Sequence, residues 1–294
     1  MHPLNTLGIQ WLKRSQWATL KFSSWLEAIQ SGIFMGLVDD ESFQAFDTYP
    51  FDETKPVDVS AETERGLEPW ERHIVREHFT DAKSVLVVGA GGVRELVGLN
   101  ELGYDTTGVE FGPALCEASR RELTLRESTA TIKTATRFEV PRKTEPYDAV
   151  FVARKFISHV HDRTNRIALL EAIRKSLRAD APLVLGFYTR ERDTLAFRMQ
   201  AALANILRRL RGRREFPVEV GDHLDPESPL YHHHFVWEEL REELREAGFT
   251  PVEYELNWFG WAVARLQPIE ERHEAKGSDA SEAMDHEQEL VESS

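Results

Sequence analysis

Cysteine is almost absent from this chain, since Cys116 is the single one among 294 residues. One cysteine cannot form an intramolecular disulfide, and the familiar zinc sites built from several thiolates are excluded. The chain also lacks an apolar run of the roughly 18 to 20 residues that a membrane span needs. Residues 1–10 have neither the basic start nor the apolar centre of a secretory signal. These absences predict a cytoplasmic protein.

Positive charge is scarce, because 36 lysines and arginines face 50 aspartates and glutamates and the net charge is −14. Residues 270–294 hold nine of the acids and two of the bases, with few apolar side chains, which predicts a disordered tail. An acidic balance argues against nucleic-acid binding, which depends on neutralising phosphates. The exception is the basic run at residues 208–214. This run is either a solvated helix end, where cations suit the helix dipole, or a patch that recognises an anion.

The most informative segment is an apolar run, residues 84–88, that stops at Gly89, Gly91 and Gly92 and continues into a helical pattern. Glycines allow a tight strand-to-helix turn, so that backbone N–H groups and a bound cofactor can approach each other closely. Glu110 follows Gly89 by 21 residues, at the end of a second strand pattern. A carboxylate at that strand tip can bind both hydroxyls of an adenosine ribose. The two features together predict a nucleotide-type site.

From residue 81 onward strand and helix patterns alternate, which predicts an α/β fold with helices on both faces of a sheet. Strands are expected at residues 84–88, 105–110, 131–135, 147–153, 182–188, 252–258 and 261–266. The last two are predicted to form a hairpin that turns at Phe259 and Gly260. A hairpin after a series of βα units places one antiparallel strand in an otherwise parallel sheet.

The chain is expected to divide into a helical N-terminal extension (1–80), a sheet domain (81–268) and the acidic tail (269–294). Residues 189–234 interrupt the sheet domain as a long insertion, and such excursions commonly build substrate pockets. We expect the extension and the insertion to cap the substrate site. The extension begins with an aromatic-rich helical pattern that includes Trp11, Trp17, Phe22 and Trp25. Such a helix packs on its own domain or lies on a membrane surface.

The order of these patterns resembles the class I S-adenosylmethionine-dependent methyltransferases over residues 71–266. The resemblance is carried by residues 85–92 (VLVVGAGG), 108–110 (GVE), 147–150 (YDAV), 176–183 (SLRADAPL) and 244–249 (LREAGF). It implies a Rossmann-like, doubly wound, mostly parallel sheet of seven strands whose last strand is antiparallel. It also implies that the chain is an enzyme that binds S-adenosylmethionine and transfers its methyl group to a small-molecule acceptor.

The resemblance implies cofactor-binding residues at the ends of the first four strands: Gly89, Ala90, Gly91, Gly92, Glu110, Phe111, Phe138, Glu139, Ala153 and Arg154. The glycine turn would bend around the amino acid end of the cofactor, Glu110 would bind the ribose and Phe111 would flank the adenine. Phe138 or Glu139 would contact the adenine, while Ala153 and Arg154 would lie near the sulfonium. The chain departs from the family pattern at Val87, where an acid is common, and at Val93, where a third glycine is usual.

A base is needed only if the methyl acceptor must lose a proton. The candidates are mainly histidines, whose ordinary pKa lies near neutrality: His159, His161 and His233, with Tyr231, His232 and His234 beside the last. Each of them could instead serve the structure. No metal is expected, because successive residues of an extended segment alternate faces and at most two of three adjacent histidines could share an ion. The metal-dependent catechol-type relatives also have carboxylates where this chain has Arg154 and Lys155.

Three alternatives to methyl transfer remain open. A nicotinamide dinucleotide fingerprint would need a glycine at the position of Arg94, whose side chain would obstruct close helix-to-strand packing. Aminopropyl transfer on the same fold would need acids around a polyamine, and no clear set is present. A catalytically silent protein could retain cofactor binding alone.

Overall fold

The computed structural model describes residues 3–39, 59–135, 139–140, 145–153, 155–190, 195–213, 216–224, 231–257 and 259–266. The described helices are α1 (Pro3–Leu37), α3 (Ser60–Arg65), α4 (Pro69–His78), α5 (Arg94–Glu101), α6 (Pro113–Leu125), α7 (Phe156–His159), α8 (Arg163–Arg174), α9 (Leu195–Leu210) and α10 (Trp237–Glu246). The described strands are β1 (Ser84–Val88), β2 (Asp105–Glu110), β3 (Thr131–Thr134), β4 (Ala149–Val152), β5 (Pro182–Thr189), β6 (Asp222–Leu224), β7 (Tyr231–Phe235), β8 (Phe249–Leu256) and β9 (Phe259–Leu266). The loop and tail residues 40–58 and 267–294 lie outside these ranges.

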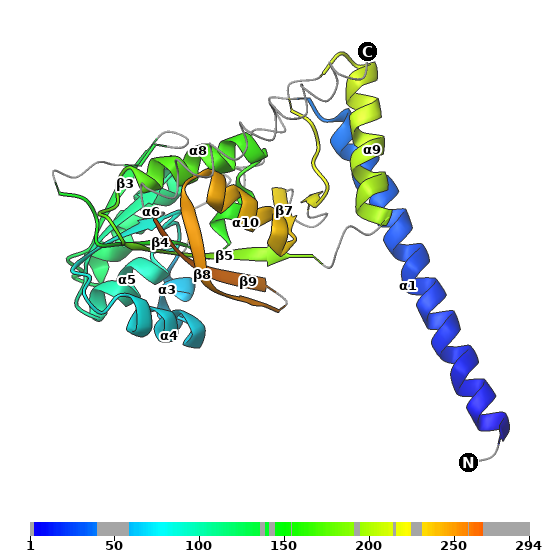
Figure 1. Cartoon of the computed structure of the whole chain (residues 1–294), viewed down its shortest axis with the longest axis horizontal. Coiled ribbons are helices and arrows are strands. Elements are labelled where there is room, and N and C mark those ends of the chain that lie inside the picture. The colour runs from blue at the N-terminus through cyan, green and yellow to red at the C-terminus, as the bar shows by residue number, and fades with distance from the viewer. Residues whose placement is uncertain are drawn as a thin grey trace, which may run out of the picture.

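The central sheet has the strand order β3-β2-β1-β4-β5-β9-β8, flanked by helices on both faces (Figure 1). Strands β1 to β5 pair in parallel, whereas β9 runs antiparallel to both β5 and β8. The predicted doubly wound sheet with a reversed last strand is therefore confirmed. The insertion adds a short hairpin, in which β6 is antiparallel to β7 and β7 extends the end of β5 in parallel.

The predicted turn of the last hairpin is wrong by two residues. Phe259 and Gly260 begin β9 and pair with Tyr188 and Phe187, so the strands β8 and β9 are joined at residues 257–258. Gly260 is required by packing, because a Cβ atom there would lie 2.4 Å from the ring of Phe187. The pattern predicts a turn at this glycine, whereas in the structure Gly260 makes room for an aromatic ring on the neighbouring strand.

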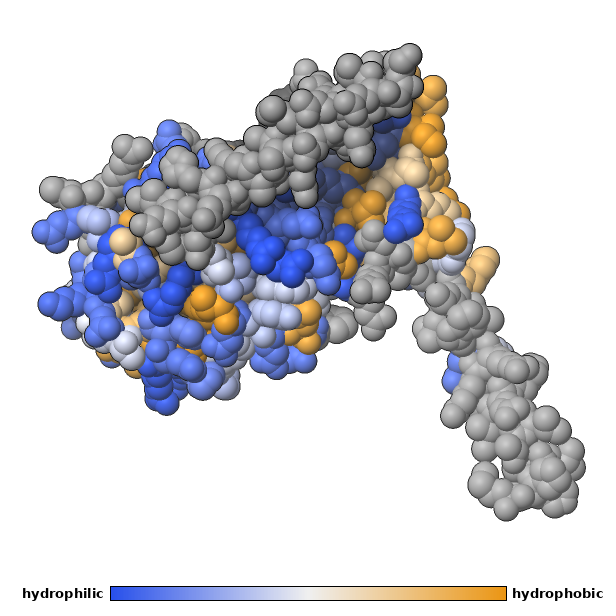
Figure 2. Space-filling model, in the orientation of Figure 1, coloured by the Kyte–Doolittle hydropathy of each residue, from blue (hydrophilic) through white to orange (hydrophobic). Residues whose placement is uncertain are grey.

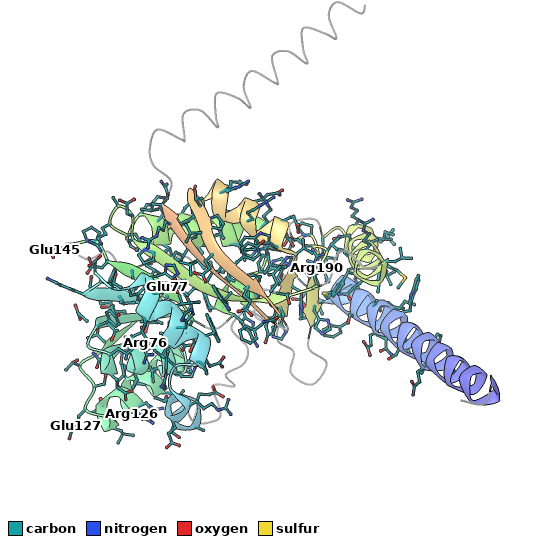
Figure 3. All side chains as sticks on the ribbon, turned by 60° about the horizontal axis from the view of Figure 1, so that its bottom comes forward. Arg76, Glu77, Arg126, Glu127, Glu145 and Arg190 are labelled. Carbon is teal, nitrogen blue, oxygen red and sulfur yellow. The ribbon has the colours of Figure 1, made fainter. Side chains whose placement is uncertain are left out.

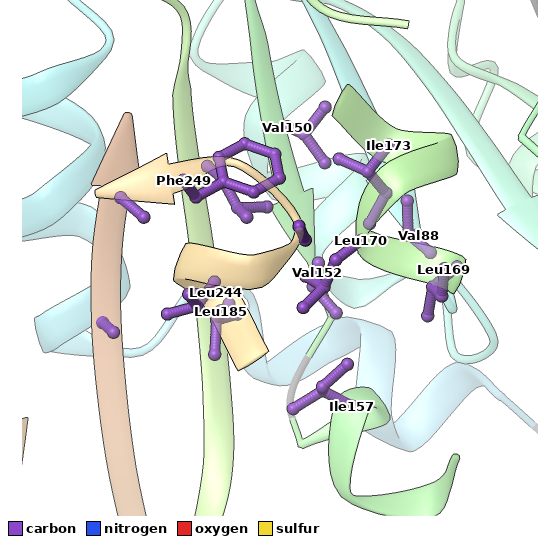
Figure 4. Packing of buried hydrophobic residues seen from close by; sticks show 14 of the residues in the cluster. Val88, Val150, Val152, Ile157, Leu169, Leu170, Ile173, Leu185, Leu244 and Phe249 are labelled. Carbon is purple, nitrogen blue, oxygen red and sulfur yellow. The ribbon is translucent and has the colours of Figure 1, made fainter. Parts of the chain in front are cut away.

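The sheet is buried on both faces, as expected for near-continuous apolar strands. In β1, Leu86 and Val88 belong to the cluster under α8 and α10 shown in Figure 4, and Val85 and Val87 belong to the cluster on the other face. Cys116 of α6 is fully buried in that second cluster, so the single cysteine is part of the packing.

The N-terminal extension contributes two short helices to the sheet domain and one long helix beside it (Figure 1). Pro69 occupies the first turn of α4, and a capping box forms because the backbone N–H of Glu68 donates to Glu71 Oε2 at 2.6 Å. The long helix α1 packs against α9 of the insertion. Within the described residues, no helix combines the length and the apolar character that a membrane crossing requires.

Arg190 fastens the insertion to the sheet domain. Its Nε donates to the carbonyl oxygen of His234 at 2.6 Å, and its Nη2 donates to the carbonyl oxygen of Val220 at 2.9 Å and to Glu239 Oε2 at 3.0 Å. Figure 3 shows Arg190 at the junction between the sheet domain and the α1–α9 pair. One guanidinium thus joins the end of β5, the hairpin and α10.

Candidate functional site

The glycine turn, residues 89–92, connects β1 to α5. Gly89 has a φ of 73°, in the left-handed region that glycine adopts without strain. The backbone N–H groups of Gly89 and Ala90 both donate to the carbonyl oxygen of Val109, at 2.9 and 3.0 Å. The first two residues of the turn are therefore anchored to the neighbouring strand β2.

Side chains from two helices hold the second half of the turn. Ser119 Oγ of α6 donates to the carbonyl oxygen of Gly91 at 2.6 Å, and Thr63 Oγ1 of α3 donates to that of Gly92 at 2.7 Å. Val93 follows with a φ of 51°, a conformation that is strained for a β-branched residue. Val93 stands where the methyltransferase pattern usually has its third glycine. It keeps the positive φ that a glycine would adopt there, although its side chain is buried.

Glu110 ends β2, and its carboxylate lies against the glycine turn. Its Oε1 accepts hydrogen bonds from the backbone N–H groups of Phe111 at 2.8 Å and Gly112 at 2.9 Å. A Cβ atom on Gly91 would lie 3.2 Å from Oε2, so the second oxygen faces the turn. Burial raises the pKa of Glu110, and bonds from the N–H groups of Gly112, Phe111 and Gly91 oppose that rise. The structure therefore brings the acid and the glycines together, as the sequence predicts.

Two phenylalanines cover the same end of the sheet. The rings of Phe111 and Phe156 are stacked, with centroids 5.3 Å apart and 11° between their planes. Phe156 also lies on Gly89, because a Cβ atom on that glycine would be 2.3 Å from Phe156 Cγ. The sequence reasoning missed Phe156. Its position three residues after Ala153, at the end of the fourth strand pattern, is the signal that could have found it.

The remaining predicted cofactor residues lie in different surroundings. Ala153 is buried, and its N–H donates to the carbonyl oxygen of Val88 at 2.8 Å, which brings the end of β4 beside the glycine turn. Glu139 is exposed, while Phe138 and Arg154 lie outside the described residues. Val87, which stands where the family commonly has an acid, is fully buried in the core.

Arg94 attaches the N-terminal extension to the glycine turn. Its two terminal nitrogens donate to the two oxygens of Glu71, both at 2.7 Å, and Nη1 also donates to the carbonyl oxygen of Gly66 at 2.9 Å. Glu95 accepts a further bond from the same guanidinium. Arg94 and both carboxylates are almost completely buried. Arg94 stands where a dinucleotide-binding turn would have a glycine, and it forms a buried ion pair with Glu71 and Glu95 instead.

A cation and several aromatic rings gather near the carboxyl ends of β4 and β5. Lys155 Nζ is 4.4 Å from the ring centroid of Tyr188 and 5.4 Å from that of Phe259. Trp70 of α4 has its ring centroid 5.9 Å from that of Phe259 and stacks on Trp261 at 6.1 Å. These side chains come from α4, β5, β9 and the residue before α7, so only the fold brings them together.

The histidines of β7 divide between the two faces of that strand, as its extended backbone requires. His232 and His234 lie beside Tyr188, with ring centroids at 4.8 and 5.2 Å, and His232 is 4.9 Å from His159. His159 Nδ1 is hydrogen-bonded to the carbonyl oxygen of Tyr231 at 3.0 Å. Burial lowers the pKa of His159, and the charge of Lys155 acts in the same direction. The imidazole of His159 is therefore neutral near pH 7.

His233 faces the other way, into a buried charge network. Its Nδ1 is 2.7 Å from Asp222 Oδ1, and its Nε2 is 3.1 Å from Glu239 Oε1. Burial and the nearby charge of Arg166 disfavour its protonation, but the two carboxylates outweigh them and raise the pKa of His233. His161 is also buried, with its ring centroid 5.0 Å from that of Tyr231.

The same network contains a possible set of metal ligands. Ligand atoms of Glu219, Asp222 and His233 lie within 4.8 Å of one another. Arg166 Nη1, however, donates to Glu219 Oε2 at 2.8 Å, so a metal ion would meet a positive charge already bound to one ligand. The absence of a metal stays a prediction.

His234 should make the protein less stable in mild acid. Burial lowers the pKa of His234 to about 4, and the charges of His223, His233 and Arg190 add to that effect. Below its ordinary pKa of about 6.5 the unfolded chain binds a proton that folded His234 does not, so the free energy of unfolding falls as the pH falls. From pH 7 to pH 5 this amounts to about 2 kcal/mol.

Urea denaturation at the two pH values tests this effect. In the His234→Gln variant, the stability lost between pH 7 and pH 5 should be smaller than in the unmodified protein by about 2 kcal/mol. His73→Gln, on the exposed side of α4, is the control. Equal pH dependence in all three proteins would contradict the burial-driven shift.

No protein-family model matches the chain, and comparison with curated proteins finds no match in sequence. Solved structures do match. An S-adenosylmethionine-dependent methyltransferase from Methanosarcina mazei has 19% identity and a TM-score of 0.52, with 69% of this chain and 99% of that chain covered. The CcbJ methyltransferase from Streptomyces caelestis has 15% identity and a TM-score of 0.51, with 76% and 96% covered.

A third match is 1,6-didemethyltoxoflavin-N1-methyltransferase from Burkholderia thailandensis, whose structure contains bound 1,6-didemethyltoxoflavin and S-adenosylhomocysteine. It has 16% identity and a TM-score of 0.51, with 79% of this chain and 92% of that chain covered. At such identities the matches establish the fold. Together with the reversed strand β9, they show that the chain has the fold of the class I S-adenosylmethionine-dependent methyltransferases.

Proposed function

We propose that this protein is an enzyme that transfers the methyl group of S-adenosylmethionine to a small-molecule acceptor. The observation that carries the proposal is the buried carboxylate of Glu110, which lies at the tip of β2 with one oxygen facing Gly91. A ribose binds at this point of a doubly wound sheet, because an acid there accepts hydrogen bonds from two sugar hydroxyls. The matched structures of the same fold support the choice of cofactor.

The residues present fit S-adenosylmethionine. Glu110 would accept the ribose hydroxyls, and the glycine turn, including Gly92, would lie along the amino acid end. Phe111 and Phe156 would hold the adenine between their parallel rings. In the structure these rings stack directly, with centroids 5.3 Å apart. A flat base between two rings needs two contact distances of roughly 3.5 Å each, so the phenylalanines must move apart on binding.

The bound sulfonium would supply an already activated methyl group, so the chain has to orient the acceptor and exclude water. Ala153 and Arg154 would lie nearest to this centre. Lys155, which follows β4, and Tyr188, near the end of β5, would contact the acceptor.

His159 is the base that we propose for acceptors that must lose a proton. It lies beside Tyr188 and His232, and its lowered pKa keeps it neutral and able to accept a proton. His161 remains a further candidate on the same segment. His233 is the weakest of the three, because both of its ring nitrogens are engaged by carboxylates and its side chain is fully buried.

A catalytically silent cofactor-binding protein is the second candidate. The observation that favours it is the departure from the methyltransferase pattern before the turn, where the buried Val87 replaces the acid commonly found there. An oxidoreductase receives less support, because Arg94 is committed to Glu71 and Glu95 where a dinucleotide-binding turn needs a glycine.

Isothermal titration calorimetry tests the cofactor, with S-adenosylmethionine, S-adenosylhomocysteine and NAD as the three ligands. We expect micromolar binding of both sulfur compounds and no binding of NAD. A protein that binds neither sulfur compound, or that selectively binds NAD, would contradict the proposal. A screen that measures S-adenosylhomocysteine released in the presence of candidate acceptors then separates an enzyme from a silent binding protein.

A further inference from the structure

Helices α1 and α9 form a parallel pair, which is called the helix pair below. Gly32 and Gly36 of α1 let the two backbones approach closely. A Cβ atom on Gly32 would lie 2.8 Å from the carbonyl oxygen of Gln200, and one on Gly36 would lie 2.7 Å from Leu207 Cβ. Gly36 follows Gly32 along α1, and its contact Leu207 follows Gln200, the contact of Gly32, along α9. The two helices therefore run in the same direction and end on the same side.

The helix pair is positively charged in an acidic protein. Together with Arg211 and Arg213, which follow α9, it holds eight lysines and arginines and a single acid, Glu27. The whole chain has a net charge of −14, so the remainder is strongly negative. The sequence of α9 itself contains no acid and three arginines.

Part of this charge has a structural role. Arg208 Nη1 donates to the carbonyl oxygens of Met35 and Val38 at 3.1 and 3.3 Å, and Arg213 Nη1 donates to those of Leu37 and Val38, both at 2.8 Å. These arginines cap the C-terminus of α1, where the carbonyl groups lack partners within the helix. Arg209 and Arg211 are exposed, and no hydrogen bond within the described residues assigns them such a role.

An apolar stripe accompanies the charge. Phe22, Leu26, Ile29, Ile33 and Leu37 recur on α1 at intervals of three or four residues, so they share one side of the helix, and all are exposed. On α9, Leu195, Ile206 and Leu210 are exposed by 63%, 55% and 79%. Figure 2 shows hydrophobic residues gathered over α9 and the adjoining part of α1, in contrast to the hydrophilic sheet domain.

A cavity of about 430 Å³ opens at the arginine-rich end of the helix pair. It is lined by Asn205, Arg208, Arg209, Arg213, Phe216 and Pro217. The side chain of Asn205 exchanges two hydrogen bonds with the backbone of Val218, at 2.8 and 2.9 Å. These bonds connect α9 to the segment that contributes Phe216 and Pro217 to the lining. Arginine guanidinium groups match the oxygens of a phosphate in geometry as well as charge. The lining is therefore suited to a phosphate group.

We infer that the helix pair docks on an anionic membrane surface. The exposed apolar side chains would enter the boundary between head groups and acyl chains, and the arginine-lined cavity would take a lipid phosphate. A second copy of the chain would explain the apolar stripe but would bring two basic helix pairs together. An anionic surface satisfies the apolar and the basic residues at once. The inference is independent of methyl transfer, because binding is measured without a cofactor or an acceptor.

Co-sedimentation of the full chain with vesicles tests the inference. Vesicles that contain phosphatidylglycerol should bind the protein, pure phosphatidylcholine vesicles should bind it far less, and added salt should weaken the binding. The Arg209→Ala/Arg211→Ala variant leaves the caps of α1 in place and should lower partitioning roughly thirtyfold. Ile206→Ser/Leu210→Ser should lower it roughly tenfold or more.

Matched controls lie on the sheet domain. Arg120→Ala/Arg121→Ala on α6 removes two exposed charges, and Val252→Ser/Leu256→Ser on β8 removes two exposed apolar side chains. Both should partition like the unmodified protein, and thermal melting checks the folding of every variant. Equal binding to both kinds of vesicle, or equal losses in the helix-pair and control variants, would overturn the inference.

Two further outcomes would also overturn it. A protein that stays off the vesicles and forms a dimer in light scattering, which Ile206→Ser/Leu210→Ser dissociates, would assign the stripe to a second copy. A protein that binds inorganic phosphate in calorimetry but no vesicles would leave an anion site without a membrane role.

Discussion

Replacing Glu110 with alanine is expected to weaken S-adenosylmethionine binding by roughly a hundredfold or more. Hydrogen bonds to a charged group contribute about 1.5–3 kcal/mol each, and the carboxylate would accept one from each ribose hydroxyl. Calorimetry on the purified variant measures the change. Because Oε1 also binds the N–H groups of Phe111 and Gly112, thermal melting must show that the variant is folded.

Two variants make this test specific. Glu117→Ala removes an exposed carboxylate of α6 that pairs with Arg120, and it should bind the cofactor unchanged. Gly91→Ala keeps the acid but places a Cβ atom 3.2 Å from its Oε2 and 2.6 Å from Leu115 Cδ2. It should weaken binding by displacing the carboxylate. A Glu110→Ala protein that is folded and binds as tightly as the unmodified one would remove the ribose-binding role.

Replacing Arg166 with methionine is expected to lower the free energy of unfolding by about 3–5 kcal/mol. Arg166 is completely buried, and its Nη2 and Nη1 donate to Glu243 Oε1 at 2.6 Å and Glu219 Oε2 at 2.8 Å. These bonds raise the pKa of Arg166 well above its ordinary value in spite of burial. Without the guanidinium, the buried carboxylate of Glu243 loses its partner, and that penalty dominates.

Arg163 provides the matched control, because it lies on the same helix. Its ion pair with Glu246 is exposed, so Arg163→Met should cost less than about 1 kcal/mol. Urea denaturation measures both variants. The Arg166→Met/Glu243→Leu double variant should recover much of the loss, since neither charge then remains buried. Similar losses in the two single variants would show that burial adds nothing to the value of the Arg166 pair.

The central sheet could be predicted because its strands are local in sequence. The apolar runs that give β1, β4 and β5 are continuous, and each is bounded by glycine, proline or polar residues. The short strand β6 has no such run, since His223 interrupts it and its pairing with β7 arises from the fold. The hairpin turn predicted at Phe259 and Gly260 is misplaced because the side chain that requires the glycine, Phe187, lies far away in the sequence.

The candidate site also has a part that the sequence predicts and a part that it does not. The glycines and Glu110 carry a spacing that a sequence can reveal, and the structure brings them together. The partners of His233 cannot be read in this manner, since Asp222 and Glu239 lie on different elements and the same strand presents His232 to the opposite face. Phe156 acquires its position from α7, a helix too short to leave a periodic pattern.

Strand β5 limits how a molecule can reach the end of the sheet. β4 ends at Val152, opposite Leu185, whereas β5 continues to Thr189. On that edge β7 pairs with the last two residues of β5, and on the other edge β9 pairs with β5 as far as Tyr188. Main chain therefore occupies both flanks of the strand end. A molecule bound for Tyr188 and Lys155 therefore cannot enter between strands in the plane of the sheet, and it has to arrive over a face of the sheet or past the strand ends.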